Sequence, residues 1–490
     1  MEGPYWTYYK ARTVAGEDHL GIKYVAINIA DILQNGISSI TPRARYWSFF
    51  AWVLYDFIEN EKDRSRTAFL KFIKLREWHY ILANLADAEN EGPSTGIIGS
   101  TKGERVWNNG QETIDYHDDY LRNPAGGYAT YANVMKLLGL TKGSDQDLGV
   151  EIDRLTEWGK KTAEAFRDTI AKTEYYKEYR NQKSVPRRVL KAYGRVGGLN
   201  RLKVNTAKDF LYLKDSFLPD RPKNEIAGYR KQSLEYYTFL MNEDESLRNA
   251  SLMKWQQTMF DHYSPWGDRK HKIPSEYRTV AYGWSIYHAR QIFTYSLESI
   301  WACVLDQMHR KVYGESDLYR DIMKELERSE VDLNTQLKVL SEGSLIEQKD
   351  RQEMIREITR KDHMAARIHR PVLMIFDLLN KLKKADDLQM IHEEFIRFGG
   401  KDHISIHEFQ EFVKAEEDSS YEEFLKSLFH RYIIRQHQNT ALHKLITTGN
   451  ETYHFIKENG KLQPIANDRP AFNVFRVYQG ISILEDLGMK

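Results

Sequence analysis

Cysteine is almost absent from this chain. Cys303 is the one cysteine among 490 residues, so neither a disulfide framework nor a four-cysteine zinc site forms within the chain. The chain also has almost no net charge. Its 71 Lys and Arg residues nearly balance its 70 Asp and Glu residues, which gives a net charge of +1. This balance argues against a basic footprint over the whole protein, but it leaves room for a local basic surface.

Long hydrophobic runs are also missing. The longest apolar stretch, around 371–379, is far too short to span a bilayer. Residues 1–6 show neither the basic nor the apolar region of a secretory signal peptide. We therefore expect a soluble, cytoplasmic protein that does not enter a membrane.

Aromatic residues and helical periodicity are what the chain has in abundance. Aromatic side chains make up 12% of the residues and hydrophobic ones 41%, which is typical of a packed globular protein. Apolar residues recur at helical spacing over 46–57, 69–82 and 421–433, and the pattern of 279–312 predicts one long aromatic helix around Cys303. We predict a mainly α-helical, multi-domain protein with small winged-helix-like α+β elements. The predicted segments are 1–125, 126–215, 216–400 and 401–490.

The glycine-rich residues 91–111 do not have the order of a phosphate-binding loop. Such a loop needs Gly-x-x-x-x-Gly-Lys-Ser/Thr between a strand and a helix. The sequence Gly99-Ser100-Thr101-Lys102-Gly103 has another order and no clear strand before it. We expect an irregular surface loop here and predict no cofactor.

Residues 127–166 show the pattern of a winged helix. A helix, two short strands and a second helix are predicted in that order, and 475–488 repeats the first half of the pattern. One hypothesis is that the recognition helix of this element enters a DNA groove. The alternative is a module for packing or protein contact.

The motif Thr41-Pro42-Arg43-Ala44-Arg45-Tyr46 is the most informative short segment. It predicts a helix with Thr41 as N-cap and Pro42 as first residue. Arginines in the first helical turn are unusual, because that end already carries partial positive charge. We expect Arg43 and Arg45 either to pair with buried carboxylates, which is slightly favoured, or to contact an anionic partner.

The stretch 177–203 has the clearest excess of charge. It contains one acid, Glu178, and nine basic residues, namely Lys177, Arg180, Lys183, Arg187, Arg188, Lys191, Arg195, Arg201 and Lys203. Tyr176, Tyr179 and Tyr193 lie among them, and cations beside aromatic rings suit a phosphate backbone with stacked bases. Glycines at 194, 197 and 198 indicate that part of the stretch is a loop. We predict contact with nucleic acid, and an acidic protein surface or a solvated linker are the alternatives.

No motif assigns a reaction. The chain has no His-Glu-x-x-His zinc site and no Gly-x-Ser-x-Gly elbow, and the His403/His407 pair lacks a third ligand nearby, so no metal site is predicted. Helical ribonucleases of the HEPN type place Arg and His on one helix face. Arg431 and His437 have such a spacing, although pairs of this kind are about as frequent in the chain as chance provides. We favour a non-enzymatic protein and keep a metal-independent RNase using Arg431 and His437 as the alternative.

The helix that carries this pair begins at a predicted capping box, Ser420 with Glu423. If the helix is regular, His430 and His437 lie one above the other, on the side away from the apolar stripe.

The motif at 41–46, with Phe49, Trp52 and the later Gly96-Ile97-Ile98-Gly99, resembles the start of a bacterial protein family encoded beside ATPases and nucleases in antiphage defence loci. The ending, 476–488, is similar to theirs too, and the likeness is loose elsewhere. The family has no established catalytic residues. The resemblance implies a subunit of a multi-gene defence system, such as one of the Menshen type, acting as sensor or adaptor.

The sequence thus predicts a non-catalytic subunit that binds nucleic acid or a phage protein and holds an ATPase or nuclease partner. The predicted contact residues are Arg43, Arg45, Lys183, Arg187, Arg188, Lys191, Arg195, Arg201 and Lys203. The alternatives are the RNase and a DNA-binding regulator that acts through the winged-helix segment.

Overall fold

The structure is a computed structural model that describes residues 18–40, 42–91, 96–144, 151–263, 272–344, 346, 348–361, 363–383, 404–473 and 475–489. The chain forms two compact units, unit 1 from Met1–Ala30 and Ala250–Asn473, and unit 2 from Asp31–Asn249 and Val474–Lys490. The boundaries of these units fall inside three of the predicted segments, 1–125, 216–400 and 401–490. Each unit is therefore built from two stretches that are separated in the sequence.

Helices dominate both units, and the predicted mainly helical fold with small α+β elements is confirmed. The strands are short and form sheets of two or three strands. Among the helices that the structure describes, none is long and apolar enough to cross a membrane.

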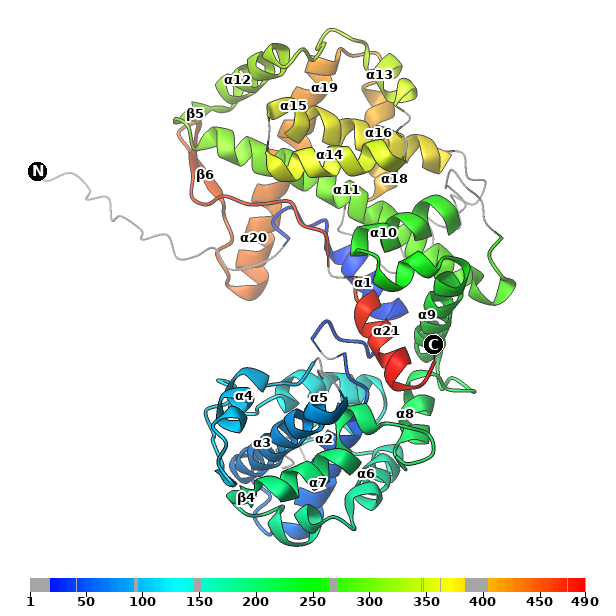
Figure 1. The fold of residues 1–490 in the computed structure, drawn as a ribbon. Coiled ribbons are helices and arrows are strands. Elements are labelled where there is room, and N and C mark those ends of the chain that lie inside the picture. The colour runs from blue at the N-terminus through cyan, green and yellow to red at the C-terminus, as the bar shows by residue number, and fades with distance from the viewer. Residues whose placement is uncertain are drawn as a thin grey trace, which may run out of the picture. The chain divides into compact units, whose positions relative to one another are not determined.

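Unit 2 is a bundle in which α2 packs against α6, and α3 packs against α7 (Figure 1). Its elements are α2 (Arg45–Asn60), α3 (Arg66–Glu91), α4 (Ser100–Asn108), β1 (Thr113–Asp115), α5 (Tyr128–Leu137), β2 (Thr141–Lys142), β3 (Arg154–Leu155), α6 (Glu157–Ile170), the π-helix η1 (Tyr175–Tyr179), β4 (Ser184–Pro186), α7 (Arg187–Gly197), the 3-10 helices η2 (Leu199–Arg201) and η3 (Glu245–Asn249), α8 (Phe210–Phe217), α9 (Glu225–Glu243) and α21 (Val477–Asp486). Helix α1 (Tyr24–Leu33) contains the boundary between the units.

Aromatic rings fill the core of unit 2. The apolar stripe of α2 is fully buried, and Phe49 stacks on Tyr80 of α3 with ring centroids 4.0 Å apart. Aromatic pairs of this kind stabilise a core beyond their buried area.

The winged-helix-like element has the predicted order. Between α5 and α6, strands β2 and β3 pair antiparallel, with Thr141 opposite Leu155. Helix α6 packs against α2 through residues such as Ala163 and Phe166, so its exposed side carries Lys160 and Lys161.

The glycine-rich region is more regular than predicted. Residues 100–108 form α4, although an irregular loop was expected throughout 91–111. Gly103 lies inside this helix, where a Cβ would come within 2.7 Å of the Ile81 side chain of α3. This glycine therefore permits close helix packing and does not mark a loop.

Unit 1 is built around α11 (Arg278–Met308), the long aromatic helix that the sequence predicts, which packs against α16 (Figure 1). Its other elements are α10 (Leu252–Gln257), η4 (Thr258–His262), η5 (Ser275–Tyr277), β5 (Tyr313–Gly314), α12 (Glu315–Arg328), α13 (Leu337–Gly343), α14 (Gln348–Arg360), α15 (Met364–Arg367), α16 (His369–Lys383), α18 (Ile406–Ala415), α19 (Tyr421–Leu428), η6 (Phe429–Arg435), α20 (Gln436–Thr448), β6 (Phe455–Glu458) and β7 (Lys461–Pro464). Cys303 is buried in α11, and burial raises the pKa of its thiol to about 11.

The predicted capping box at α19 is confirmed, because Ser420 and Glu423 exchange both of its hydrogen bonds. The helix then changes to a π-helix, η6, before α20 begins. Strands β6 and β7 form a hairpin, and β5 pairs with the free edge of β7. Asn459 and Gly460, both with positive φ, make the turn of the hairpin.

Candidate functional site

Arg43 and Arg45 both form ion pairs within unit 2. Arg45 is fully buried, and its Nη2 lies 3.1 Å from Asp209 Oδ1. The same guanidinium donates to the carbonyl oxygens of Val196 and Gly198, and Ser48 Oγ donates to Asp209 Oδ2. Arg45 therefore has internal partners for its charge, as the first of the two predicted roles requires.

The start of α2 is stabilised by a residue from the other end of the chain. The Asp486 carboxylate accepts a hydrogen bond from the Ala44 backbone N–H at 2.8 Å and pairs with Arg43 at 3.0 Å. A carboxylate offsets the positive helix end, and Arg43 balances the carboxylate. Helix α2 begins at Arg45, so Pro42 is not its first residue as predicted, and Thr41 lies outside the described residues.

Four of the nine basic residues at 177–203 pair with acids of unit 2. The pairs are Arg180 with Asp56, Arg188 with Glu174, Lys191 with Glu89, and Arg201 with Asp87. Arg187 donates to the carbonyl oxygens of Trp107 and Gln111, and its guanidinium lies 3.9 Å from the Trp107 ring centroid. The basic surface is thus smaller than the sequence predicts.

The remaining four basic residues point to solvent. They are Lys177, Lys183, Arg195 and Lys203, all exposed and without an ion pair among the described residues. Arg195 lies on α7, Lys177 lies in η1, and Lys183 and Lys203 lie beside β4 and η2. The elements η1, β4 and η2 all pack against α7. These cations therefore gather around one helix.

Helix α7 presents a row of cations on its solvent side. Arg188, Lys191 and Arg195 are spaced i, i+3 and i+7, which puts them on one face over about 10 Å. The opposite face packs on α3 at short range, since a Cβ on Gly194 would lie 2.1 Å from the Ala83 carbonyl oxygen. Gly194 and Gly197 are helical, so the predicted loop is wrong for these two glycines, which permit close packing. Gly198 follows the helix as its C-cap in extended backbone.

Two of the three predicted tyrosines, Tyr176 and Tyr193, already pack against other side chains, whereas Tyr179 is half-buried. Tyr193 is fully buried and stacks on Tyr175, with ring centroids 4.1 Å apart. Tyr176 is covered by the Arg180 guanidinium, 4.3 Å from its ring centroid. The sequence predicted that both cations and stacking rings of this stretch contribute to nucleic-acid binding. In the structure, the cations are the more accessible of the two.

Arg431 and His437 do not form a catalytic pair. Arg431 is exposed, whereas His437 is fully buried. His437 Nδ1 lies 3.0 Å from the His19 carbonyl oxygen, and its Nε2 accepts the backbone N–H of His454 at 3.0 Å. Burial lowers the pKa of His437 to about 3. With both nitrogens used and no access to solvent, this imidazole cannot serve an RNase as acid or base.

The expected alignment of His430 and His437 is also wrong. His430 is exposed and contacts Glu315, while His437 is buried. The cause is the π-helix η6, which spans residues 429–435, contains His430 and ends before His437. Its i to i+5 hydrogen bonds make a wider turn, so residues seven apart no longer share a face.

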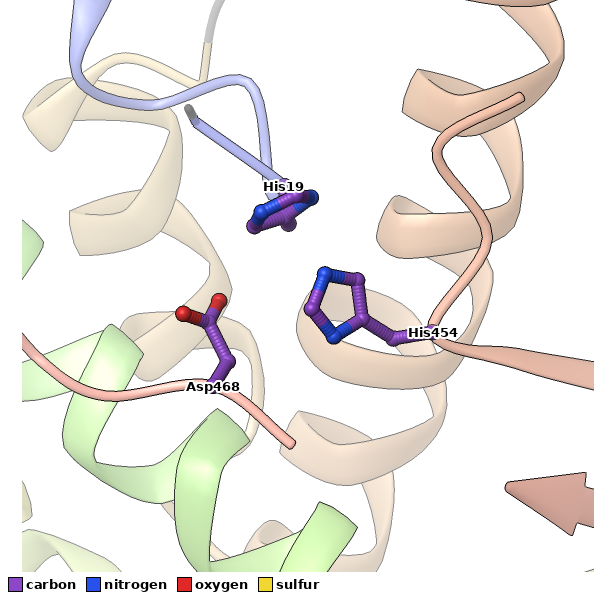
Figure 2. A group of neighbouring side chains, drawn as sticks. All are labelled: His19, His454 and Asp468. Atoms are coloured by element: carbon purple, nitrogen blue, oxygen red, sulfur yellow. The ribbon is translucent and has the colours of Figure 1, made fainter. Parts of the chain in front are cut away.

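A cluster of three ligand-type side chains lies in unit 1. His19, His454 and Asp468 each offer one atom, and these atoms lie within 4.8 Å of one another (Figure 2). The imidazole ring centroids of His19 and His454 are 3.9 Å apart. Both histidines are at least nine-tenths buried. Burial lowers the pKa of His19 to about 4 and also lowers the pKa of His454, so both rings are neutral near pH 7.

Local structure explains how the three residues meet. His454 precedes β6 and Asp468 follows β7, so the antiparallel hairpin brings them to its open end. His19 comes from the turn before α1, where the Asp18 carboxylate accepts the N–H groups of Ile22 and Lys23. This cluster was not predicted from the sequence. Asn459-Gly460 is a hairpin signal that places 454 near 465, but no local pattern brings His19 to this hairpin.

Comparison with known proteins adds no family to these observations. No protein-family model matches the chain, and no curated protein or solved structure matches it. The function of this chain is therefore inferred from the geometry of the two units.

Proposed function

We propose that this protein is a non-catalytic adaptor subunit that binds the phosphate backbone of nucleic acid through the solvent face of α7. The observation that carries the proposal is the row Arg188, Lys191 and Arg195, with Lys183 and Lys203 on neighbouring segments. Phosphate contacts from such a row supply affinity without reading sequence.

The ion pairs on this face do not prevent binding. Arg188 pairs with Glu174 and Lys191 with Glu89, but these side chains are 33–69% exposed. Exposed pairs stabilise a fold only weakly, because solvent and salt screen the two charges. A polyanion that releases its counterions on contact can therefore displace both carboxylates.

The geometry also favours a binding role over the two alternatives. Arg431 and His437, the residues of the RNase alternative, do not share a surface, because His437 is buried and Arg431 is exposed. The DNA-binding alternative depends on the exposed face of α6. This face carries two acids and two lysines, namely Glu157, Asp168, Lys160 and Lys161, so its charge is mixed, whereas the row on α7 is basic.

A binding titration with paired charge reversals tests the nucleic-acid part. Fluorescence anisotropy would follow a labelled duplex and a labelled single strand at 50 and 200 mM salt, concentrations over which phosphate-driven binding changes steeply. We expect Lys183→Glu/Arg195→Glu/Lys203→Glu to weaken binding at least tenfold and to lower the salt slope by about 0.7–0.9 for each phosphate that the variant no longer neutralises.

The matched control is Lys160→Glu/Lys161→Glu on α6, which alters charge in the same unit. It should bind like the unmodified protein. Loss of binding in the α6 variant with retention in the α7 variant would overturn the proposal in favour of the winged-helix regulator.

The adaptor part needs a partner. The tagged protein would be purified from its native host, with nucleic acid digested in half of the sample. An ATPase or nuclease that co-purifies after digestion is the expected result, and membership of an antiphage defence complex predicts it. Recovery of nucleic acid alone, removed by digestion, would mean that the chain acts without these partners.

A further inference from the structure

We propose that His19, His454 and Asp468 of unit 1 bind one divalent transition-metal ion. Two imidazoles and one carboxylate are a donor set that suits zinc and iron(II). The proposal is independent of nucleic-acid binding, because it concerns unit 1 and the basic face of α7 belongs to unit 2.

The first argument is that the cluster contains unused nitrogen atoms. His19 Nδ1 and His454 Nε2 are buried and have no hydrogen-bond partner among the described residues. His454 Nδ1 lies 3.2 Å from the Ala466 carbonyl oxygen, which fixes the proton on Nδ1. The lone pair of His454 therefore lies on Nε2, and this is the arrangement found in metal-binding histidines.

The second argument is that the surrounding residues hold the ligands in place. Trp301 Nε1 donates to Asp468 Oδ2 at 2.9 Å and orients the carboxylate. His437 joins the other two ligand segments, because it contacts the His19 carbonyl oxygen and accepts the His454 backbone N–H. An outer shell of this kind raises metal affinity by orienting the ligands.

The third argument is electrostatic. Asp468 forms no ion pair within the part of the chain that the structure describes, although two lysines lie near the cluster. Lys23 pairs with Glu298 at 2.8 Å, and Lys444 donates to the Asp18 carbonyl oxygen at 2.6 Å. The Asp468 oxygens accept hydrogen bonds from Trp301 Nε1 and the Arg469 N–H, but no cation among the described residues balances the carboxylate charge.

The dimensions suit an ion of this class. Ligand atoms about 2.1 Å from a tetrahedral centre are about 3.4 Å apart. Starting from separations within 4.8 Å, the cluster needs to contract by at most about 1.4 Å. Three protein ligands leave the fourth position for water. The ion would join the segment at His19 to the distant hairpin that carries His454 and Asp468.

Zinc titration of the full chain tests the proposal. After dialysis against a chelator, isothermal titration with ZnCl2 should show one ion per chain, and excess Zn2+ should raise the melting temperature. We expect His454→Gln and Asp468→Asn to weaken Zn2+ binding at least tenfold and to remove the thermal shift. Fe2+ and Mn2+ as competitors would rank the metals.

The control variant is His430→Gln, an exposed histidine that contacts a carboxylate of the same unit. It should bind Zn2+ like the unmodified protein. Asp468→Asn changes the shape of the side chain very little, so circular dichroism will show it folded. The proposal is overturned if the chain takes up no stoichiometric zinc, if both cluster variants bind it unchanged, or if His430→Gln causes the same loss.

Discussion

Two buried polar regions, the Arg45 network of unit 2 and the His19–His454–Asp468 cluster of unit 1, differ in how fully their side chains are partnered. In unit 2, the buried Arg45 guanidinium has the Asp209 carboxylate and two carbonyl oxygens as partners. In unit 1, His19 and His454 are buried beside Asp468 with one nitrogen each unpartnered among the described residues. A buried group with all its partners supports the architecture, because nothing remains for a ligand. In the cluster, unpartnered nitrogen atoms of two buried histidines lie close to a carboxylate, and an unmade hydrogen bond in such a place is costly unless a ligand uses it.

The largest expected effect comes from breaking the Arg45 network. Arg45→Met leaves Asp209 buried without its cation, and we expect a loss of about 3–5 kcal/mol in the free energy of unfolding. Urea denaturation measures it, with Arg195→Met as the exposed control, expected within about 0.5 kcal/mol of the unmodified protein. A loss below about 1 kcal/mol would mean that Asp209 finds other partners, and the contrast between the two units would then fail.

Glu77 of unit 2 is an intermediate case, because it has hydrogen-bond donors but no ion-pair partner among the described residues. It accepts from Tyr120 and from the Gly127 N–H, and burial raises its pKa from 4.5 to about 7. The folded state therefore holds this proton more tightly than the unfolded state. Its stabilising contribution is complete below pH 4.5 and is lost as the pH rises to about 7, by an amount on the order of 3 kcal/mol.

Glu77→Gln should remove this part of the pH dependence. Urea denaturation between pH 4.5 and 7.5 would compare the variant with the unmodified protein, and Glu157→Gln, on the exposed side of α6, serves as the control. Parallel pH profiles for Glu77→Gln and the unmodified protein would show that Glu77 ionises normally.

His437 of unit 1 is a buried histidine whose two ring nitrogens both have hydrogen-bond partners. His437→Leu leaves the His19 carbonyl and the His454 N–H without their partner, so we expect a loss of about 1–3 kcal/mol. His443→Leu, an exposed position on the same helix α20, should be close to neutral. RNA cleavage by the pure protein that His437→Leu abolishes, with folding intact, would instead support the RNase alternative.

The smallest effect is expected at Asp468. Without metal, Asp468→Asn keeps an acceptor for Trp301 and should change stability by less than about 1 kcal/mol. With excess Zn2+, the difference between the variant and the unmodified protein should widen. A large loss in the metal-free state would show that Asp468 has a structural role, like Asp209 in unit 2.

Several features were predictable because they depend on neighbours in sequence. The long helix α11, the capping box of α19 and the order of α5, β2, β3 and α6 all follow from local periodicity and capping. The start of α2 was predicted three residues early, because its stabilising carboxylate, Asp486, comes from the far end of the chain.

The candidate sites show the same limit. The charge excess at 177–203 was visible in the sequence, but the acids that neutralise part of it, such as Glu89 and Asp87, lie on α3 or at its end. The glycines of α7 suggested a loop, although Gly194 allows close packing on α3 and Gly197 lies against Ile170 of α6. Helix spacing placed His437 with His430, and a π-helical turn separated them.

By itself, the sequence determined that the protein is mainly helical, that its core is aromatic, and that one stretch carries an excess of cations. Periodicity, capping and composition act over a few residues, so they can be read along the chain. Only the tertiary structure decided which cations stay exposed and that His19 meets His454 and Asp468. Those outcomes depend on which distant segments pack together. The burial and the partners of a side chain set its charge and reactivity, and both are determined by residues far away in the sequence.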